Sequence, residues 1–326
     1  MARWLFLLFA ASVTLATALA PSFTQAQAWP AKPVKIIVPA QPGGGLDLVG
    51  RTFAEQLGRA LNQTFLVENV SGGGGQIATQ ATARAAPDGY TLMVGYVGTH
   101  GTNPAVRKVP YDAVKDFTAI AMVGGTPNVL VVQPSLPVTD LKGLIDYAKH
   151  NPAKMTYAAG GIGTLNHLAV EQFKAAAGFD ALAAQYRSIG PAITDFIGGQ
   201  TMMIMPGLAA GLPHIRAGKM KPLAVTGLKR HALLPQVPTF EESGFKGFDG
   251  VQWYGIVGPA KMPAGITKKL NAEINKAIAS PALQRRLAAE ALDPMPMSPE
   301  QFAAFIRADI ARWTALARER KISLDD

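Results

Sequence analysis

Three glycine-rich loops restrict the possible folds of this chain, because each lies between a predicted strand and a predicted helix. The loops are residues 43–45, 72–75 and 160–163, and they follow apolar runs at 34–38, 65–67 and 155–158. Glycine leaves backbone N–H groups uncovered, so a glycine run at the start of a helix can bind an anion without a charged side chain. The loops therefore predict anion capture by the main chain, and a purely structural turn is the alternative for the first of them.

Strand-like and helix-like segments alternate along most of the chain. Further strands are predicted at 91–96, 129–132, 201–205, 221–225 and 253–257, and helices at 47–60, 76–86, 141–148, 164–177, 191–197 and 208–217. Three more helical patterns follow at 266–279, 281–291 and 299–321. This alternation predicts an α/β fold with mainly parallel sheets.

Capping residues mark the starts of several predicted helices. Thr139 is the predicted N-cap of the helix that begins near residue 141. Ser298, Pro299 and Gln301 form a predicted capping box with proline at the first helical position. Asp47 follows the first glycine loop, and we interpret it as a helix cap rather than a catalytic acid, because a carboxylate is stabilised at a helix N-terminus.

The first 28 residues have the pattern of a targeting segment. Arg3 gives a positive start, residues 4–20 are almost entirely apolar, and Ala26-Gln27-Ala28 matches the small-x-small cleavage pattern. We interpret residues 1–28 as a secretory signal peptide that is cleaved before Trp29. An uncleaved membrane anchor is the alternative, and the helix-breaking Pro21 disfavours it.

The length of the mature chain predicts two domains. Removal of 28 of the 326 residues leaves 298, which is more than one small core usually organises. We expect residues 29–130 and 252–326 to form domain 1 and residues 131–251 to form domain 2. A domain inserted between two halves of another produces a hinged cleft, and ligands bind in such clefts where loops from both domains face each other.

Composition excludes several classes of function. The chain has no cysteine, so it has no thiol catalysis, no Cys-ligated metal and no disulfide. Lys and Arg number 31 and Asp and Glu 22, but the basic residues are scattered and form no block of five or more. The excess of positive charge can attract acidic ligands, whereas we expect no nucleic acid partner.

Motif spacing excludes further sites. The glycine loops match neither the dinucleotide-binding pattern nor the P-loop pattern. The five histidines show no short metal-ligand spacing, and no Gly-x-Ser-x-Gly elbow of a serine hydrolase occurs. We therefore expect no catalytic residues, no metal and no cofactor.

Taken together, segments throughout the mature chain resemble one family, the periplasmic solute-binding receptors of tripartite tricarboxylate transporters, also called TctC-like or Bug proteins. The matching segments are Trp29-Pro30-Ala31-Lys32-Pro33, Val38-Pro39, Pro42-Gly43-Gly44-Gly45-Leu46-Asp47, Val67-Glu68-Asn69, Ala86-Pro87-Asp88-Gly89-Tyr90-Thr91-Leu92, Pro127-Asn128-Val129-Leu130-Val131-Val132, Leu212-Pro213-His214-Ile215, Ala217-Gly218-Lys219, Leu223-Ala224-Val225-Thr226 and Pro235-Gln236-Val237-Pro238-Thr239.

The resemblance implies a two-domain periplasmic binding protein, a type II-like Venus flytrap that closes on its ligand. Such receptors hold carboxylates mainly through main-chain amides and trapped waters, and they deliver them to a membrane partner. We accordingly expect a periplasmic monomer that binds a small carboxylate and partners the membrane subunits of a tripartite transporter. A secreted α/β enzyme acting on a carboxylated substrate and a ligand-presenting sensory protein are the alternatives.

The resemblance and the loop positions together predict the ligand site. In the family, the first glycine loop and the loop at 159–164 correspond to the two sides of that site. His100 and His167 follow predicted strands and could donate to a carboxylate, with simple packing as the alternative. The predicted ligand-binding residues are Ala40, Gln41, Gly43, Gly44, Gly45, Asp47, Ser71, Gly73, Tyr96, Thr99, His100, Ala159, Gly160, Gly163, Thr164, His167, Tyr186, Ser188 and Pro206.

Three departures from the family pattern bear on ligand choice. The family often has an aromatic residue at the position of Ala40 and a hydroxyl residue at that of Leu46, so this pocket is expected to be wider and more apolar at one end. Many members carry Asp at the position of Pro206, where some use it for a ligand ammonium group, and its absence argues against an amino acid ligand. We therefore expect a dicarboxylate or an aromatic carboxylate.

Some side chains near the predicted loops have two interpretations. Met202, Met203 and Met205 are interpreted as core filling, with an apolar wall for the ligand, together with Tyr96 and Tyr186, as the alternative. Arg187 is the one cation in the loop at 186–191, and we expect it to face solvent.

Overall fold

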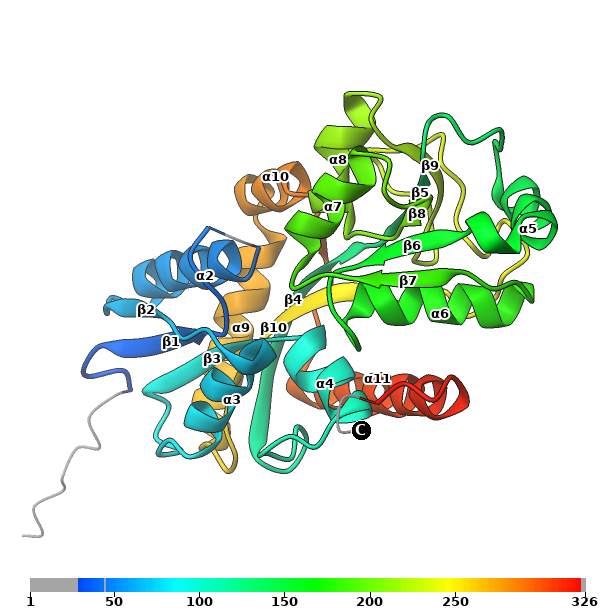
Figure 1. The fold of residues 1–326 in the computed structure, drawn as a ribbon. Coiled ribbons are helices and arrows are strands. Elements are labelled where there is room, and N and C mark those ends of the chain that lie inside the picture. The colour runs from blue at the N-terminus through cyan, green and yellow to red at the C-terminus, as the bar shows by residue number, and fades with distance from the viewer. Residues whose placement is uncertain (1–28, 44, 324–326) are drawn as a thin grey trace, which may run out of the picture. The chain divides into compact units, whose positions relative to one another are not determined.

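A computed structural model describes residues 29–43 and 45–323 (Figure 1). The predicted signal peptide and Gly44 therefore lie outside the described residues. The chain separates into an N-terminal unit that ends at Ala31 and one compact unit that begins at Lys32. The fold below is that of the second unit, which contains two β-sheets.

A six-stranded sheet has the order β11-β4-β10-β3-β1-β2. Its members are β1 (Val34–Val38), β2 (Phe65–Asn69), β3 (Thr91–Tyr96), β4 (Phe117–Pro127), β10 (Val251–Pro259) and β11 (Asp293–Pro294). Strand β1 runs parallel to β2 and β3, whereas β10 runs antiparallel to both β3 and β4. A strand from late in the sequence thus lies between two early ones.

Helices cover both faces of this sheet, since successive residues of a strand point to opposite faces. Val38 and Val94 lie against Gly50 in α2 (Gly45–Leu61). Ile37 and Met93 instead belong to the core cluster that includes residues of α3 (Gln76–Ala83) and α11 (Pro299–Glu319). Figure 1 shows α2 and α3 on opposite sides of β1.

Four further helical segments belong to this part of the chain. They are η2 (Gly98–Thr102), α4 (Asn103–Val106), α9 (Ala264–Ala279) and α10 (Pro281–Ala289). The short η1 (Gly73–Gly75) is formed by the second glycine run, in which Gly72 to Gly75 all have positive φ. Glycine adopts this conformation with little strain, which is why the run can turn so tightly before α3.

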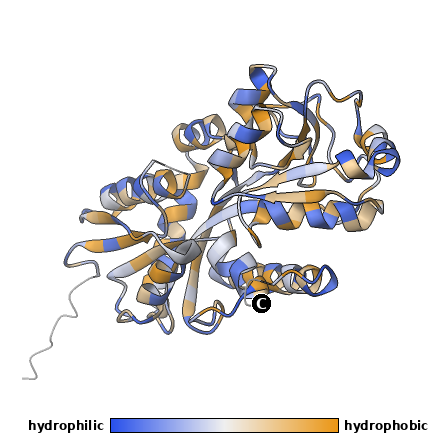
Figure 2. Cartoon of the chain, in the orientation of Figure 1, coloured by the Kyte–Doolittle hydropathy of each residue, from blue (hydrophilic) through white to orange (hydrophobic). Residues whose placement is uncertain are grey.

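A five-stranded sheet has the order β7-β6-β8-β5-β9. Its members are β5 (Val129–Val132), β6 (Thr156–Ala159), β7 (Leu182–Gln185), β8 (Met203–Ile204) and β9 (Lys221–Val225). One face packs against α5 (Leu141–His150) and α6 (Leu165–Ala177), and the other against α7 (Ile189–Ile197) and α8 (Leu208–Arg216). A single turn, η3 (Pro152–Lys154), follows α5. Figure 2 shows apolar residues along strands and helices of both sheets.

Both sheets are mixed, whereas the sequence pattern predicts mainly parallel pairing. In the second sheet β6 is parallel to β7 and β8, but β5 is antiparallel to β8 and β9. The prediction assumed that a helix returns the chain between successive strands. Strands β4 and β5 are instead separated by Asn128 alone, and they pass from one sheet directly into the other.

Many predicted elements match the structure closely. Strands β1, β3, β5 and β9 have the predicted bounds, and Gly178 ends α6 in the left-handed conformation. The Ser298–Gln301 capping box is confirmed. The predicted cap of α5 is wrong, because Asp140 rather than Thr139 accepts the Gly143 N–H, at 2.7 Å.

The division into domains stays a prediction. Its boundary at 130/131 lies within β5, a member of the five-stranded sheet. Strands 34–127 and 251–294 belong to one sheet and strands 129–225 to the other. Within the described residues, none of the helices has the length and hydropathy needed to cross a membrane.

A buried carboxylate ties the return strand to the last helix. Asp309 in α11 accepts the indole N–H of Trp253 in β10 at 2.8 Å and pairs with Arg312 at 2.6 Å. Gly101 in η2 leaves room for it, since a Cβ there would lie 2.6 Å from Asp309 Oδ2. One side chain therefore connects β10, α11 and η2.

We expect Asp309→Ala to lower the free energy of unfolding by about 2–4 kcal/mol, because it leaves the buried Trp253 N–H without its acceptor and removes the buried one of the two carboxylates that pair with Arg312. Urea unfolding followed by circular dichroism measures this change. Asp249→Ala is the matched control, since Asp249 also pairs with Arg312, at 2.5 Å, but is half exposed. The control is expected to cost less than about 1 kcal/mol, and equal losses for both variants would contradict the assignment.

Candidate functional site

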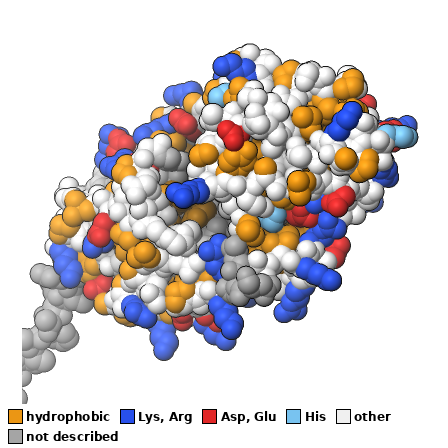
Figure 3. Space-filling model, in the orientation of Figure 1, with side chains coloured by type: hydrophobic (Ala, Val, Ile, Leu, Met, Phe, Trp, Pro, Cys, Tyr) orange, Lys and Arg blue, Asp and Glu red, His pale blue; other side chains and the backbone are white. Residues whose placement is uncertain are grey.

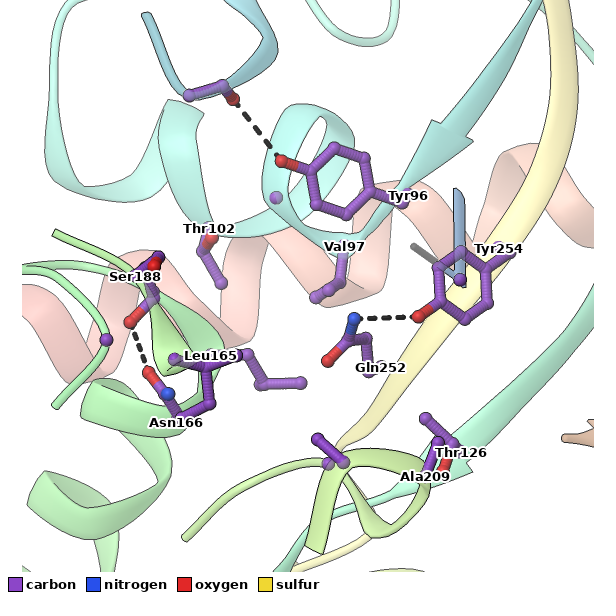
Figure 4. Close-up of a pocket in the computed structure, with 18 of the residues that line it drawn as sticks. Tyr96, Val97, Thr102, Thr126, Leu165, Asn166, Ser188, Ala209, Gln252 and Tyr254 are labelled. Atoms are coloured by element: carbon purple, nitrogen blue, oxygen red, sulfur yellow. Dashed lines mark hydrogen bonds between the residues drawn. The ribbon is translucent and has the colours of Figure 1, made fainter. Parts of the chain in front are cut away.

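A cavity of about 640 Å³ is the candidate ligand site. Its walls come from strands of the six-stranded sheet and from loops and helices that pack on the five-stranded sheet, and Figure 4 shows side chains of β3, β4, β10, α6 and α8 directed into it. Near the middle of Figure 3 the surface is hollowed. The lining residues are Gly43, Gly45, Leu48, Gly74, Tyr96, Val97, Gly98, Thr102, Asn103, Arg107, Thr126, Gly160, Thr164, Leu165, Asn166, Arg187, Ser188, Ile189, Gly207, Ala209, Ala210, Gln252, Tyr254, Glu290 and Leu292.

Four long helices begin at this cavity, and the short α4 also begins there, at Asn103. Gly45 opens α2, Leu165 opens α6, Ile189 opens α7, and Ala209 lies in the first turn of α8. The first amides of a helix have no partner within the helix, and the helix dipole places partial positive charge there. The cavity is therefore surrounded by main-chain donors suited to an anion.

These helix starts also lack the usual side-chain caps. Thr164, Ser188 and Gly207 occupy the N-cap positions of α6, α7 and α8, and none of them accepts a side-chain capping hydrogen bond from a backbone N–H of its helix. By contrast, Asp140, Ser280 and Ser298 cap α5, α10 and α11, which begin away from the cavity. Threonine and serine are good capping residues, yet the side chains of Thr164 and Ser188 leave the first amides of α6 and α7 available at the cavity.

Glycine lets two of these helix starts approach each other. A Cβ on Gly160 would lie 2.8 Å from the backbone nitrogen of Ile189 and 3.0 Å from Nδ2 of Asn166. Any larger residue at 160 would push the start of α7 away from the start of α6. The third glycine run thus sets the spacing of donors from two helices.

The first glycine loop is held by a buried carboxylate. Asp47 accepts the Gly43 N–H at 2.9 Å, Arg51 Nε at 2.9 Å and Asn69 Nδ2 at 3.0 Å, and Asn69 also donates to the Ala40 carbonyl at 3.1 Å. These donors, led by Arg51, lower the pKa of Asp47 to about 2 despite its burial. Asp47 is therefore a fixed negative charge that shapes the loop from behind.

Uncharged polar side chains line the wall formed by the six-stranded sheet. Tyr96 donates to the Gly74 carbonyl at 3.3 Å, and Gln252 donates to the Tyr254 hydroxyl at 2.7 Å (Figure 4). Burial raises the pKa of Tyr96 to about 12 and also raises that of Tyr254. Both phenols are consequently neutral at ordinary pH and act as hydrogen-bonding groups.

Three charged side chains line the cavity, namely Arg107, Arg187 and Glu290. Arg187 and Glu290 are exposed, and Arg107 is half-buried. The predicted exposure of Arg187 is correct, yet the side chain also borders the cavity. Two cations against one carboxylate favour an acidic ligand.

The structure brings together six of the predicted site residues at the cavity, namely Gly43, Gly45, Tyr96, Gly160, Thr164 and Ser188. Gly44 lies outside the described residues. The other predicted residues do not line the cavity: Ala40, Gln41, Asp47, Ser71, Gly73, Thr99, His100, Ala159, Gly163, His167, Tyr186 and Pro206. Several of these hold the loops from behind, as Gln41 does by donating to Ser71 Oγ at 2.6 Å.

The two candidate histidines are packing residues in this structure. His100 is fully buried, its ring meets Phe117 edge-on at 4.6 Å, and burial lowers its pKa to about 3. His167 stacks on Tyr157 at 6.1 Å and accepts the Gly163 N–H at 3.1 Å, while burial lowers its pKa. Both rings are neutral at pH 7 and add no positive charge to the site.

The methionine cluster belongs to the core, as the preferred interpretation predicts. Met203 and Met205 are fully buried beside the five-stranded sheet, and Met202 packs against the same cluster. Tyr186 packs against the second core cluster of that sheet. Of the side chains in the alternative ligand wall, Tyr96 lines the cavity, whereas Tyr186 and the three methionines do not. The apolar lining comes from Leu48, Val97, Leu165, Ile189 and Leu292.

Sequence reasoning missed the contributions of β4, β10 and the η2–α4 segment. Thr126, Gln252 and Tyr254 lie on the two long antiparallel strands, and Asn103 and Arg107 follow η2. Gln252 and Tyr254 alternate along β10, so they share one face. That spacing was the available signal, but the pairing partner of β10 was not predictable from it.

Among the described residues, no cluster of His, Asp and Glu could hold a metal ion.

Asp47→Asn is expected to weaken the fold at neutral pH and to alter its acid response. A folded-state pKa of about 2, below the ordinary 3.8, means that the stabilisation is complete above about pH 4 and disappears as the pH falls towards 2. Allowing for the exposure of Arg51, we expect a loss of about 1–2 kcal/mol at pH 7 and a flatter pH dependence below pH 4. Urea midpoints at pH 7, 4 and 2.5 test this. Glu55→Gln is the control, because Glu55 makes only exposed ion pairs, with Arg59 and Arg286. It should lower the stability at pH 7 by less than about 1 kcal/mol and leave the pH dependence close to that of the wild type.

Gly163→Ala should perturb the site, whereas Gly178→Ala should cost only backbone strain. Both glycines are left-handed, with φ of 72° and 65°, but a Cβ on Gly163 would overlap Val106 whereas Gly178 has open space. We expect Gly178→Ala to lower the free energy of unfolding by about 1 kcal/mol and Gly163→Ala to lower it clearly more. Thermal unfolding compares the variants, and identical Tm shifts would refute the contact with α4.

Comparisons with known proteins agree with this geometry. The family model described as tripartite tricarboxylate transporter family receptor, TctC, matches residues 49–322. Protein BugT of Bordetella pertussis is 34% identical over 319 residues, covering 96% of this chain and 97% of BugT.

Two solved structures carry carboxylates. The R. palustris protein Rpa4515 with adipate is 33% identical, with a TM-score of 0.81 over 90% of this chain and 99% of that one. MatC from Rhodopseudomonas palustris with bound malate is 29% identical, with a TM-score of 0.76 over 88% and 99%. By sequence and by fold, this chain belongs to the TctC or Bug family of tripartite tricarboxylate transporter receptors, with the two-domain α/β fold of a periplasmic binding protein.

Proposed function

We propose that this receptor captures a small carboxylate in the cavity and delivers it to the membrane subunits of a tripartite tricarboxylate transporter. The observation that carries the proposal is the set of uncapped helix starts at Thr164, Ser188 and Gly207, which face one cavity. Each supplies amide donors and partial positive charge at a fixed position. A carboxylate accepts several such bonds at once, and hydrogen bonds to an ionised acceptor are stronger than neutral ones.

A dicarboxylate or an aromatic carboxylate is the ligand class that we propose. Two relatives hold adipate and malate, both of which are dicarboxylates. Leu48, Val97 and Leu165 supply apolar surface for the hydrocarbon part of such a ligand. Tyr96 and Tyr254 supply neutral hydroxyls that can bond to an acid group without repelling it.

Closure on the ligand follows from the origin of the lining residues. We propose the division in which residues 29–130 and 252–326 form one domain and residues 131–251 the other. Gly45 and Tyr254 would then meet the ligand from one domain, and Asn166 and Ser188 from the other. A ligand that makes both sets of contacts stabilises the closed state over the open one.

The place of action that we propose is the periplasm, after cleavage of residues 1–28. Residues 1–28 carry the charge, apolar run and cleavage pattern of a signal peptide. We further propose that the mature protein is a monomer and releases its ligand unchanged. The cavity lining contains neither His nor Cys, and its one carboxylate, Glu290, is exposed. Hydroxyls such as that of Ser188 line the cavity, but the lining has no buried base to activate them as a hydrolytic site would need.

A carboxylate panel tests the proposal. Protein stripped of retained ligand by unfolding and refolding is titrated calorimetrically with adipate, malate, benzoate, aspartate and glutamate. At a hundredfold excess over Kd, a bound carboxylate adds about 2.7 kcal/mol of stability, which corresponds to a Tm increase of about 5 °C or more. The dimethyl esters of adipate and malate, which lack charge, should give no shift.

Two outcomes would contradict parts of the proposal. Tight binding of aspartate or glutamate with no response to dicarboxylates or benzoate would overturn the ligand class. Chemical change of a bound ligand, followed by proton NMR over hours, would overturn the receptor role in favour of an enzyme.

A further inference from the structure

Arg107 is a cavity cation without a partner of its own. It follows α4 as its C-cap residue, and its backbone N–H donates to the Asn103 carbonyl. The side chain is half-buried and lines the cavity, and its Nε is shielded from solvent with no hydrogen-bond partner. Within the described part of the chain, no carboxylate forms an ion pair with it.

The backbone carbonyl beside the Arg107 guanidinium already accepts two hydrogen bonds. The guanidinium lies close to Gly74, since a Cβ there would be 3.9 Å from Arg107 Nη1. The Gly74 carbonyl accepts from Tyr96 Oη at 3.3 Å and from Asn103 Nδ2 at 2.9 Å, which uses both of its lone pairs. The Gly74 carbonyl therefore has no lone pair left to accept a hydrogen bond from the Arg107 guanidinium.

A shielded N–H without a hydrogen-bond partner lowers the stability of the folded state, and a shielded charge without a counter-ion lowers it further. A carboxylate entering the cavity would remove that cost, because the planar guanidinium matches it with two parallel hydrogen bonds. The charge already acts on its neighbours: burial raises the pKa of Tyr96, and the positive charge of Arg107 acts in the opposite direction.

Arg107 and the uncapped amides belong to different parts of the fold. Arg107 follows α4, which packs on α11 and η2 beside the six-stranded sheet, whereas α6, α7 and α8 cover the five-stranded sheet. The two meet at the cavity, where Val106 fills the space left by Gly163. A single cavity therefore holds two separate anion-binding elements.

We propose that Arg107 binds a second acidic group of the ligand, so that the solute is a dianion with one carboxylate at the helix amides and the other at this guanidinium. The inference rests on the proposed carboxylate receptor function and narrows it. Arg107 is then the residue that distinguishes dicarboxylates from monocarboxylates. Leu165 and Val97, which also line the cavity, would contact the carbon chain between the two charges.

Matched probes isolate the second charge. Calorimetry with succinate, glutarate, adipate and pimelate, each compared with its monomethyl ester, measures a dicarboxylate-to-ester affinity ratio. For the preferred length we expect a ratio of at least ten in the wild type, in line with charge-assisted hydrogen bonds. Arg107→Gln should weaken that dicarboxylate by about 10- to 100-fold and its ester by less than about threefold, and Arg107→Lys should give an intermediate ratio.

Arg187→Gln is the matched control, because Arg187 lines the same cavity but is exposed. It should keep the wild-type ratio. A ratio that is near one in the wild type, or that survives in Arg107→Gln, overturns the inference while leaving the carboxylate receptor intact. The wild-type ratio tests the inference even if the variants fail to fold. If the wild type binds benzoate but no diacid, the inference is overturned, and if it binds neither these acids nor malate nor benzoate, the proposed function itself fails.

Discussion

Unsatisfied backbone amides are the constraint on which this structure depends. A helix must leave its first N–H groups without internal partners, and most proteins satisfy them with side chains or water. Here α5, α10 and α11 use side-chain caps, but the helices that begin at Thr164, Ser188 and Gly207 do not. In the function that we propose, these free helix amides are the groups that bind the ligand. The glycine at 160 brings two of these ends close enough to serve one ligand.

Charge is arranged around the cavity in two ways. Behind the first glycine loop, Asp47 is fully engaged by Arg51, Asn69 and the Gly43 amide, so its negative charge stays within the scaffold. At the cavity, Arg107 has no such counter-charge, and burial keeps His100 and His167 neutral. The scaffold charges are therefore balanced, while the ligand-facing charge is left positive. This asymmetry favours an acidic solute without making the loops unstable.

The local parts of this architecture could be predicted from the sequence. Strand β1 and the glycines at 43, 45 and 160 follow from hydrophobic runs, turn chemistry and backbone freedom, which act over a few residues. Gln252, Tyr254 and Thr126 could not be placed, because β10 finds its position between β3 and β4 through contacts far apart in the sequence. Arg107 was missed for a similar reason, since the short η2–α4 segment lacks a helical apolar period.

Strand β10 has a consequence for how binding is communicated. It follows β9 of the five-stranded sheet and then pairs within the six-stranded sheet, and it carries Gln252 and Tyr254 into the cavity. The same strand is fastened to α11 through Trp253 and Asp309, on the face opposite these two side chains. A solute that contacts Tyr254 would therefore touch the strand by which the chain returns to the six-stranded sheet. The residues of β10 that line the cavity and the residue that holds β10 to α11 are neighbours in one strand, so a shift of this strand on binding would reach α11 directly.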